Sequence, residues 1–330
     1  MTGTTVAAGS QPFEARAGRS DRRSRVSIGV PVFNGERYLH ACLDSLLAQT
    51  YGDIEILISD NASTDRTPEI CREYCQRDQR VRYFRQPRNR GVAANYRFLV
   101  EQATGEFFKW AAYDDVCAPR FVERCVAALD RSPSDVLAFP RTTFIDGAGE
   151  PLARIDGGVR WRNHPKSIGR LNDLLIDHTR SFAKWQFGVI RRDALLRTGL
   201  IRNYDASDLV LMAELALLGG FARVDEPLFR LRIHEATSGV ANASAHQLAN
   251  WYDPNHDDHH YPLDRTSVLI GYLRAVATSR LALHEKVAGI GLIARWLFSD
   301  RQWRVIGGEL KLRVLSSARR CLQPRVVDRS

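Results

Sequence analysis

The chain of 330 residues lacks several features, and each absence narrows what the protein can be. It has no run of about 18 uncharged apolar residues, so no membrane-spanning helix is expected. The first 25 residues have no apolar core of a secretory signal, and we interpret them as a disordered polar arm of a cytoplasmic protein. The six cysteines form no paired C-x-x-C sets, so we expect free thiols rather than a zinc site or a disulfide framework.

Motifs of three enzyme classes are absent as well. After the first apolar strand there is no G-x-G-x-x-G and no Walker A loop, which argues against a dehydrogenase and a P-loop ATPase. The G-x-S-x-G elbow of serine hydrolases is also missing. What the sequence does have is a net charge of +9, which favours phosphates or an anionic membrane surface as partners. Its aromatic residues are not interleaved with basic ones, so no nucleic acid is expected.

Apolar runs and helical periodicity alternate through residues 26–150. The pattern predicts strands at 26–33, 54–60, 81–86, 106–113 and 135–146. Between them it predicts helices at 38–47, from Thr67 onward with Thr67 as N-cap, at 90–105 and at 119–129. Several of the strands are apolar throughout. The sequence therefore predicts an α/β fold with a mostly parallel central sheet flanked by helices on both faces.

The pattern changes after residue 150. Residues 151–187 show no clear period, a strand and a short helix are predicted at 187–200, and a strong helix begins just after Ser207. Residues 221–234 predict one or two strands interrupted by Pro227. We expect a flexible loop at 236–262, in which the stretch NHDDHH at 255–260 favours a solvated loop over a metal site. Residues 263–330 predict a helical C-terminal extension.

Polar side chains stand at the ends of three predicted strands. Phe33 and Asn34 follow the first strand, Asp60 ends the second, and Asp114 and Asp115 follow the fourth. In parallel sheets ligands bind outside the carboxyl ends of the strands, so these side chains should meet at one edge. Two adjacent carboxylates repel each other and predict a nearby positive charge; the alternative is a pair that only caps the next helix.

The stretches VPVFNGERYL, SDNASTDRT and YDD, in this order at the ends of strands, resemble the family-2 inverting glycosyltransferases with the GT-A fold. The resemblance covers roughly residues 26–233. It implies a GT-A catalytic domain at 26–235, with a nucleotide-binding half at 26–150 and an acceptor half at 151–235. It also implies a metal-dependent, inverting transfer of a sugar from a nucleotide diphosphate, with UDP favoured, to a glycan or lipid-linked acceptor. The implied setting is the assembly of bacterial surface polysaccharide or glycolipid.

By this resemblance, the donor nucleotide is bound by residues of the first half. Phe33 would stack on the base and Asp60 would accept a hydrogen bond from it. The segment RNRGVAANYRFL resembles the N-x-G-x-x-x-A-R-N stretch of the family, with Asn95 near the usual Arg-Asn pair. The implied donor-binding set is Pro31, Phe33, Glu36, Asp60, Asp65, Asn89, Gly91, Asn95 and Asp114.

The stretch AAYDD takes the place of the D-x-D-D metal motif of the family, with Ala112 where the first Asp is often found. The resemblance implies that Asp115 ligates Mn²⁺ or Mg²⁺ and that Asp114 contacts the ribose or the metal. His234 would complete the metal shell or touch the phosphates; the alternative is an ordinary structural histidine. A hard cation held by carboxylates neutralises the pyrophosphate leaving group. Arg230 and Arg232 are further candidates for phosphate contacts.

A carboxylate near the start of the helix after Ser207 resembles the general base of the family. Asp208 is the first candidate and Asp205 the second. The alternative is a plain N-cap made by Ser207 or Asp208.

Two other functions and one surface stay open. A sugar-phosphate nucleotidyltransferase would need a Gly- and Arg-rich loop after the first strand, which is missing. A non-catalytic relative that binds sugar nucleotides is favoured by Ala112. In the C-terminal extension, Trp296, Phe298 and Trp303 among many arginines fit an in-plane helix on the anionic inner face of the membrane; the alternative is a helix packed on the catalytic domain.

Overall fold

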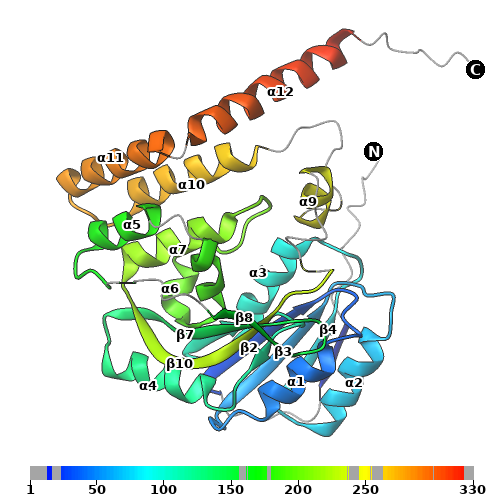
Figure 1. Ribbon diagram of the computed structural model, residues 1–330. Helices are drawn as coiled ribbons and strands as arrows, with labels where there is room; N and C mark the ends of the chain where they lie inside the picture. Colours follow the sequence, from blue (N-terminus) through cyan, green and yellow to red (C-terminus); the bar gives the residue numbers. More distant parts are fainter. Residues whose placement is uncertain are drawn as a thin grey trace, which may run out of the picture.

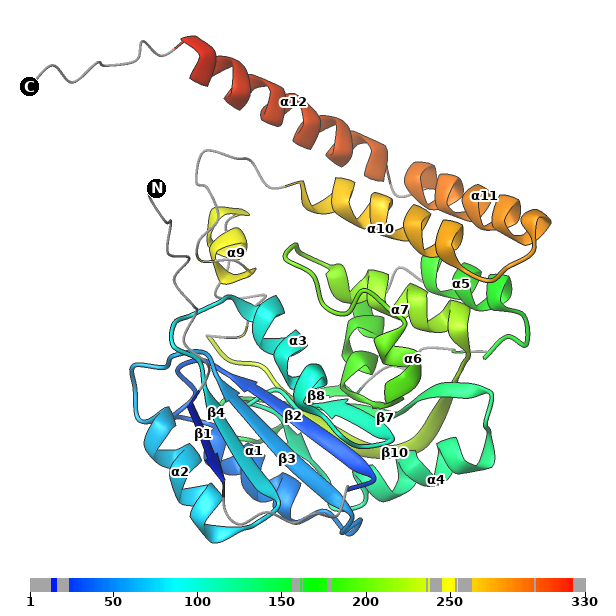
Figure 2. The same ribbon diagram turned by 180° about the vertical axis from the view of Figure 1, so that it is seen from behind.

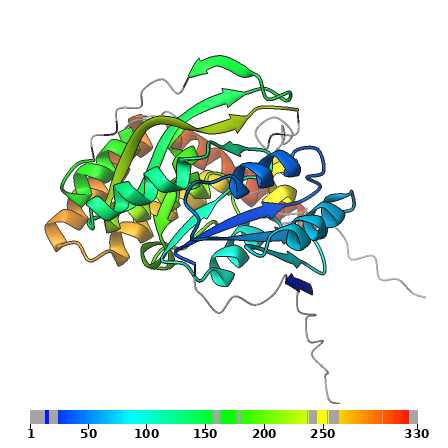
Figure 3. The same cartoon turned by 90° about the horizontal axis from the view of Figure 1, so that it is seen from below.

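The structure is a computed structural model, and it describes residues 13–16, 24–155, 161, 163–176, 180–235, 237, 245–252, 254, 263–299 and 301–322. A single sheet runs through the molecule with helices on both of its faces, and the C-terminal helices form a further layer on one side (Figures 1 and 2). Seen from below, the sheet is curled and its faces are covered from both directions (Figure 3).

The first half follows the predicted alternation closely. Its elements are β2 (Val26–Val32), α1 (Leu39–Leu47), β3 (Ile54–Asp60), α2 (Thr67–Arg77), β4 (Val81–Arg85), α3 (Val92–Gln102), β5 (Phe107–Trp110), β6 (Val116–Cys117), α4 (Phe121–Arg131) and β7 (Asp135–Ile145). Almost every side chain of β2 and β3 is buried. Such apolar runs are typical of parallel strands that are covered on both faces of the sheet. Helix α2 already includes Thr67, and the N–H of Thr67 binds Asp65 Oδ1, so Thr67 is not its N-cap.

The sheet order is β1-β4-β3-β2-β5-β9-β7-β10-β6, with β8 (Pro151–Ile155) paired to β7. Strands β4, β3, β2 and β5 are parallel neighbours, as expected. Strand β9 (Val189–Arg191) runs antiparallel to both of its neighbours, β5 and β7, so the whole sheet is mixed. Strand β1 (Phe13–Arg16) pairs antiparallel with β4, so the disorder that we expected of the N-terminal arm does not hold for these four residues.

The second half contains α5 (Ser167–Ile176), the 3-10 helix η1 (Arg180–Phe187), α6 (Arg192–Leu196), α7 (Ser207–Leu218) and β10 (Gly220–Arg232). The strand, short helix and long helix predicted for 187–218 are confirmed. Pro227 does not divide β10. Instead, the pairing with β7 shifts its register between Val224 and Phe229, which places the proline in a bulge where no ladder N–H is needed.

Within the described residues, the chain then forms α9 (Ala245–Tyr252), α10 (Asp264–Thr278), α11 (Leu283–Ser299) and α12 (Gln302–Leu322). The helical extension is therefore confirmed, whereas α9 lies within the expected flexible loop. Residues 255–260, for which we predicted a solvated loop, lie outside the described residues. None of the described helices is long and apolar enough to cross a membrane.

The core lies on both faces of the sheet. One buried cluster joins β2 and β3 to α1, α2 and α4, and a second joins the other face to α3, α6 and α7. A third cluster joins α5, α7, α10 and α11, which fixes the C-terminal layer to the rest of the fold. Five cysteines, at positions 42, 71, 75, 117 and 125, are buried free thiols as predicted.

Candidate active site

The two adjacent carboxylates lie in a turn between β5 and β6. Strand β5 ends at Trp110, and the N–H of Asp115 binds the carbonyl of Ala112, which turns the chain into β6. Strand β6 then pairs antiparallel with the end of β10, with Val116 opposite Arg230. This short pairing, which the sequence did not predict, brings the carboxylates beside the last residues of β10.

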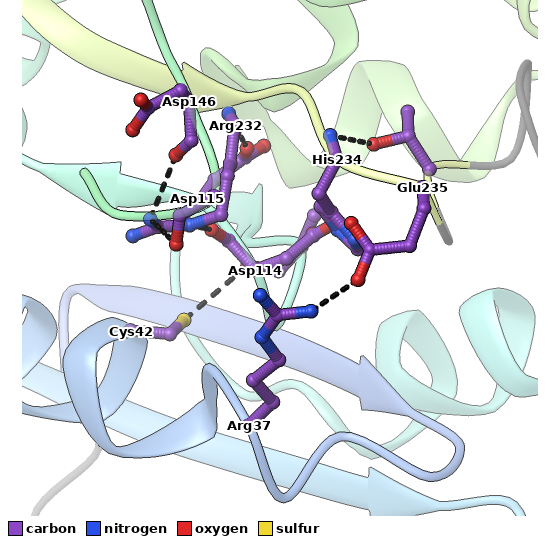
Figure 4. A network of polar contacts seen from close by, with 11 residues as sticks. Arg37, Cys42, Asp114, Asp115, Asp146, Arg232, His234 and Glu235 are labelled. Carbon is purple, nitrogen blue, oxygen red and sulfur yellow. Dashed lines mark hydrogen bonds and ion pairs between the residues drawn. The ribbon is translucent and has the colours of Figure 1, made fainter. Parts of the chain in front are cut away.

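Asp114 faces His234 across this junction. His234 Nε2 lies 3.0 Å from Asp114 Oδ2, and the imidazole is almost fully buried (Figure 4). Its ring also packs on Tyr38, with the ring centroids 4.6 Å apart. The next residue, Glu235, forms an exposed ion pair with Arg37. His234 therefore lies beside the carboxylate motif, and its contact with a metal or with phosphates stays a prediction.

Arg232 holds the same turn through hydrogen bonds to the protein itself. Its N–H donates to Asp115 Oδ1 at 2.8 Å, and its Nε donates to the carbonyl of Asp114 at 2.8 Å. Its Nη1 donates to the carbonyls of Asp146 and Gly147 (Figure 4). Because the side chain is buried and engaged in this way, the predicted phosphate contact of Arg232 is wrong for this conformation. Arg230, two residues earlier, is exposed.

The surroundings of Asp115 disfavour the ionised form of its carboxyl group. Burial raises the pKa of Asp115 well above its usual range, and the charge of Asp114 raises it further. The N–H of Arg232 and the ammonium group of the buried Lys109 oppose this pKa shift but do not cancel it. The positive charge that the carboxylate pair needs is thus only partly supplied by the protein.

These residues fit a divalent cation in part. Among the described residues, no three His, Cys, Asp or Glu side chains are arranged to hold an ion, so the predicted three-ligand set is not assembled. Asp115 Oδ1 binds the Arg232 N–H instead. Asp114 and His234 do present an oxygen and a nitrogen 3.0 Å apart. Two neighbouring ligands of an octahedral ion, each about 2.1 Å from it, lie about 3 Å apart.

Asp60 is buried at the end of β3. One carboxylate oxygen accepts a hydrogen bond from the Ser63 N–H at 2.7 Å and the other from the Tyr83 hydroxyl at 2.8 Å. The side chain has no exposed surface, so it holds the loop after β3 from the interior of the fold. A direct contact of Asp60 with a base stays a prediction.

The loop after β2 is tied to the loop after β3. Asn34 adopts a positive φ of 51°, and its Oδ1 accepts a hydrogen bond from the Thr64 N–H. Asp65 accepts from the Glu36 N–H at 3.0 Å and from the Thr67 N–H at 3.0 Å. Burial favours a higher pKa of Asp65, but the hydrogen bonds from Thr67 and Glu36 outweigh it and lower that pKa.

One aromatic side chain is left open at this edge of the sheet. Phe33 is 41% exposed and stands at the end of β2, where stacking on a base is possible. Pro31, by contrast, is buried within β2 opposite Ser59 of β3. The predicted contact of Pro31 with the base is therefore not supported by its position.

The loop between β4 and α3 is held by two asparagines and a glycine. Asn61 Nδ2 donates to Asn89 Oδ1 at 2.7 Å, and Asn89 Oδ1 also accepts the N–H of Gly91. Gly91 has a φ of 80°, which favours glycine, and helix α3 begins directly after it. Asn95 is buried. Its Oδ1 accepts a hydrogen bond from the Ser59 hydroxyl, and its Nδ2 donates to the Ser59 carbonyl. Asn95 therefore ties α3 to β3, and these contacts do not support its predicted place in the donor-binding set.

Asp208 lies in the first turn of α7. Burial raises the pKa of Asp208 to about 6, although the Leu209 N–H that it accepts works against the shift. The N-cap of α7 is Ala206 in a left-handed conformation, and no side chain caps the helix. Neither Ser207 nor Asp208 is therefore the plain N-cap that we considered as an alternative. Asp205 lies one turn earlier, and its N–H donates to Asp264 Oδ1.

Tyr96 of α3 connects the two acidic groups of the site. Burial raises the pKa of Tyr96, and the negative charges of Asp114, Asp115 and Asp208 all add to that increase. The charges of these carboxylates, which belong to the two halves of the chain, therefore all act on the buried Tyr96. Their sum of negative charge is suited to a cation and to proton transfer from a neutral hydroxyl.

Other tyrosines on which these carboxylates act were not predicted. Burial and the charge of Asp114 raise the pKa of Tyr113 to about 12. Burial raises the pKa of Tyr252, and the charge of Asp208 raises it further. Tyr252 packs against the buried cluster that includes residues of α3 and α7. No sequence motif singles out these tyrosines. Aromatic side chains on helices and turns are most often part of a core, so their presence alone does not indicate a site.

Comparisons with known proteins show the family of this chain. A family model described as glycosyl transferase family 2 matches residues 27–198. The chain is 31% identical over 125 residues to glycosyltransferase GlyA of Streptococcus pneumoniae, which covers 38% of this chain and 18% of that protein. It is 26% identical over 260 residues to the putative glycosyltransferase EpsH of Bacillus subtilis, which covers 79% of this chain and 67% of that one.

Among solved structures, S. aureus TarS 1-349 in complex with UDP-GlcNAc is similar, with a TM-score of 0.59 and 18% sequence identity over 83% of this chain and 73% of that one. At this identity the likeness concerns the fold. The match spans less than half of the length of GlyA, so the activity of such relatives does not transfer as a whole.

Proposed function

Because this chain belongs to glycosyl transferase family 2 and has the GT-A fold, we propose that it transfers a sugar from a nucleotide diphosphate donor to the hydroxyl group of an acceptor. The observation that carries the proposal is the junction of β6 with β10, where Asp114 Oδ2 lies 3.0 Å from His234 Nε2 and Asp115 is buried beside it. This junction supplies the charge needed to hold a pyrophosphate through a cation, and Asp208 of α7 supplies a carboxylate whose pKa is suited to proton transfer.

The donor is proposed to lie across the carboxyl ends of β2, β3 and β5. Phe33 would stack on the base, and Asp60 would either accept a hydrogen bond from it or position the loop that does. TarS has been solved with UDP and with UDP-GlcNAc, which supports a UDP-sugar as donor here. A dTDP-sugar is the next candidate, since both pyrimidines are of similar size.

We infer that Mn²⁺ or Mg²⁺ is used with the donor. Asp114 and His234 would hold it, with Asp115 close by and the remaining positions left to phosphate oxygens and water. When bound, such an ion supplies charge neutralisation for the departing pyrophosphate. Its presence would also relieve the repulsion between Asp114 and Asp115.

Asp208 is proposed as the general base, with Asp205 as the second candidate. Its carboxylate would take the proton from the acceptor hydroxyl while that oxygen attacks the anomeric carbon and the bond to the pyrophosphate oxygen breaks. A pKa of about 6 leaves Asp208 ionised at neutral pH yet more basic than an ordinary aspartate. A single displacement of this kind inverts the anomeric configuration.

The acceptor is proposed to be a glycan or a lipid-linked sugar in the assembly of bacterial surface polysaccharide or glycolipid. The half of the site that would meet it includes Asp208 of α7 and Tyr252 of α9, whose pKa the charge of Asp208 raises. Ala112, in place of the first Asp of the motif, is the one feature that favours a non-catalytic relative.

A panel of nucleotide sugars with Mn²⁺ tests the donor. Thermal shift should rise with UDP-sugars, because a ligand of the folded state stabilises it by mass action. Slow hydrolysis of the stabilising donor in the presence of Mn²⁺ should follow, which excludes the non-catalytic alternative. Equal stabilisation by UDP and GDP would contradict the base assignment, and retention of the anomeric configuration, measured by NMR, would contradict the single displacement.

A further inference from the structure

Helix α11 has two apolar sides. One side carries Ile293 and Trp296, which are buried in the cluster with α5 and α10. Trp296 packs edge-on against Tyr272 of α10, with the ring centroids 5.2 Å apart. Trp296 is therefore packed into the fold, which is the alternative that we gave to a place on a membrane surface.

The other side of α11 is apolar and uncovered. Leu283, Val287, Ile290 and Phe298 are 78%, 62%, 51% and 66% exposed. With 3.6 residues per turn, these positions fall within roughly 80° of the helix circumference, opposite the buried side. Scattered exposed apolar residues are normal, but a continuous stripe along a whole helix marks an interaction surface.

Helix α12 also exposes apolar side chains, on two of its sides: Val305 and Leu312 lie on one side and Trp303 and Leu310 on the other. Trp303 and Leu310 are nearly half exposed and lie seven residues apart, on one side of the helix. On the inner side, Glu309 is buried and accepts hydrogen bonds from the N–H groups of Arg265 and Thr266 at the start of α10. This buried carboxylate anchors α12 to the layer. Helices α11 and α12 follow one another along the side of the molecule farthest from the sheet (Figures 1 and 2).

The charge of the chain is concentrated in the same segment. Residues 263–330 contain 13 Lys and Arg against 5 Asp and Glu, a net of +8 out of the +9 of the whole chain. By helical spacing, Lys286 and Arg295 lie at the two edges of the apolar stripe of α11. Arg304, whose guanidinium lies 5.2 Å from the ring centroid of Trp303, and Lys311 are exposed on α12.

We propose that this face, formed by Leu283, Val287, Ile290, Phe298, Trp303 and Leu310, lies in the plane of an anionic lipid bilayer. The apolar side chains would enter the boundary between headgroups and acyl chains, and the flanking basic side chains would reach the anionic headgroups. A second copy of the chain is the other possible occupant. Two copies joined by this face would bring two segments of net +8 together, whereas an anionic surface is attracted by them.

Co-sedimentation of the full chain with vesicles tests this without any need for activity. The chain should bind vesicles of phosphatidylglycerol and phosphatidylcholine at about 0.1 M salt, and should lose most of this binding at about 1 M salt. It should bind phosphatidylcholine alone much more weakly. Replacing Arg295 and Arg304 by Gln should weaken binding about fivefold for each charge.

The apolar part is tested by the triple variant V287S, I290S and F298S, which should weaken binding at least about tenfold. Leu196→Ser is the matched control, because Leu196 is 49% exposed on α6, away from this face, and should leave binding unchanged. Unchanged thermal midpoints of these surface variants show that the fold is intact.

Three results would overturn the proposal. One is no binding of the intact chain to anionic vesicles at low salt, and another is equal binding of the triple variant. The third is a concentration-dependent dimer in sedimentation velocity that the triple variant abolishes, which would identify the face as an interface between copies.

Discussion

His234 and Asp114 are 120 residues apart in the chain, yet His234 Nε2 lies 3.0 Å from Asp114 Oδ2. The pairing of β6 with β10 explains this contact. Val116 lies opposite Arg230 in antiparallel register, so the residues before Val116 run beside the residues after Arg230. The contact between the halves of the domain is thus made where the proposed pyrophosphate site lies.

Replacing either member of this pair should weaken activation by Mn²⁺. In Asp114→Asn and His234→Gln we expect the Mn²⁺ concentration for half-maximal transfer to rise about 10- to 100-fold, the usual cost of disturbing the surroundings of a metal. The measurement is product formation against free Mn²⁺ at saturating donor. Glu235→Gln is the control, because Glu235 is exposed and pairs with Arg37 instead. Full activity of the parent chain in excess EDTA would rule out metal use.

Turnover should fall on the acid side as Asp208 becomes protonated. Since the pKa of Asp208 is raised to about 6, the ionised base is lost as the pH drops through that value. The pH profile of kcat should show this limb, and Asp208→Asn should lower kcat by about 10²- to 10⁴-fold without it. Asp205→Asn, the neighbouring control, should keep both the limb and most of the turnover.

The same shift predicts a gain in stability for Asp208→Asn. The folded state holds this proton more tightly than the unfolded chain, whose aspartates have a pKa of about 3.9. Stability from this group is therefore present at low pH and is lost as the pH rises from about 4 to about 6. Above that window the uncharged Asn should raise the free energy of unfolding by up to about 3 kcal/mol. A less stable variant at pH 8, measured by urea unfolding, would show that Asp208 is not desolvated.

Removing Asp60 should cost stability before it costs binding. Asp60→Ala leaves the Ser63 N–H and the Tyr83 hydroxyl without their acceptor, and we expect a loss of about 2–4 kcal/mol in the free energy of unfolding. Tyr83→Phe removes only one of these hydrogen bonds and should lose about 1 kcal/mol. Titration with UDP at low temperature separates the two roles. Normal stability combined with lost UDP binding would mean that Asp60 contacts the base directly.

Arg232 and Arg230 should respond differently to the same substitution. Arg232→Met removes the donors to the carbonyls of Asp114, Asp146 and Gly147, so it should lower the free energy of unfolding by about 2–4 kcal/mol. Arg230→Met is the matched control on the same strand; as an exposed position it should change stability by less than about 0.5 kcal/mol. A higher KM for the donor in Arg230→Met alone would assign the phosphate contact to Arg230. Equal stability of both variants would contradict the role given to Arg232.

Much of the fold of residues 26–150 could be predicted because its elements are local. The apolar runs of β2 and β3 and the stripe of α1 follow the period of a buried strand and an amphipathic helix. Strand β6 and helix α9 were not predictable in this way. A two-residue strand has no period, and α9 interrupts a long polar stretch.

What the sequence by itself determined is the order of strands, helices and acidic motifs, and from it the family and the edge of the sheet that carries the site. What each polar side chain touches was decided only by the tertiary structure. From the sequence, Asn95 and Arg232 are candidates for ligand contacts. In the structure, Asn95 binds Ser59 and Arg232 binds backbone carbonyls instead. Trp296 and Phe298 are two residues apart on one helix, yet one is buried and the other exposed. The reason is that buried hydrogen-bond groups must find partners, and the partners come from distant parts of the chain that only packing brings together.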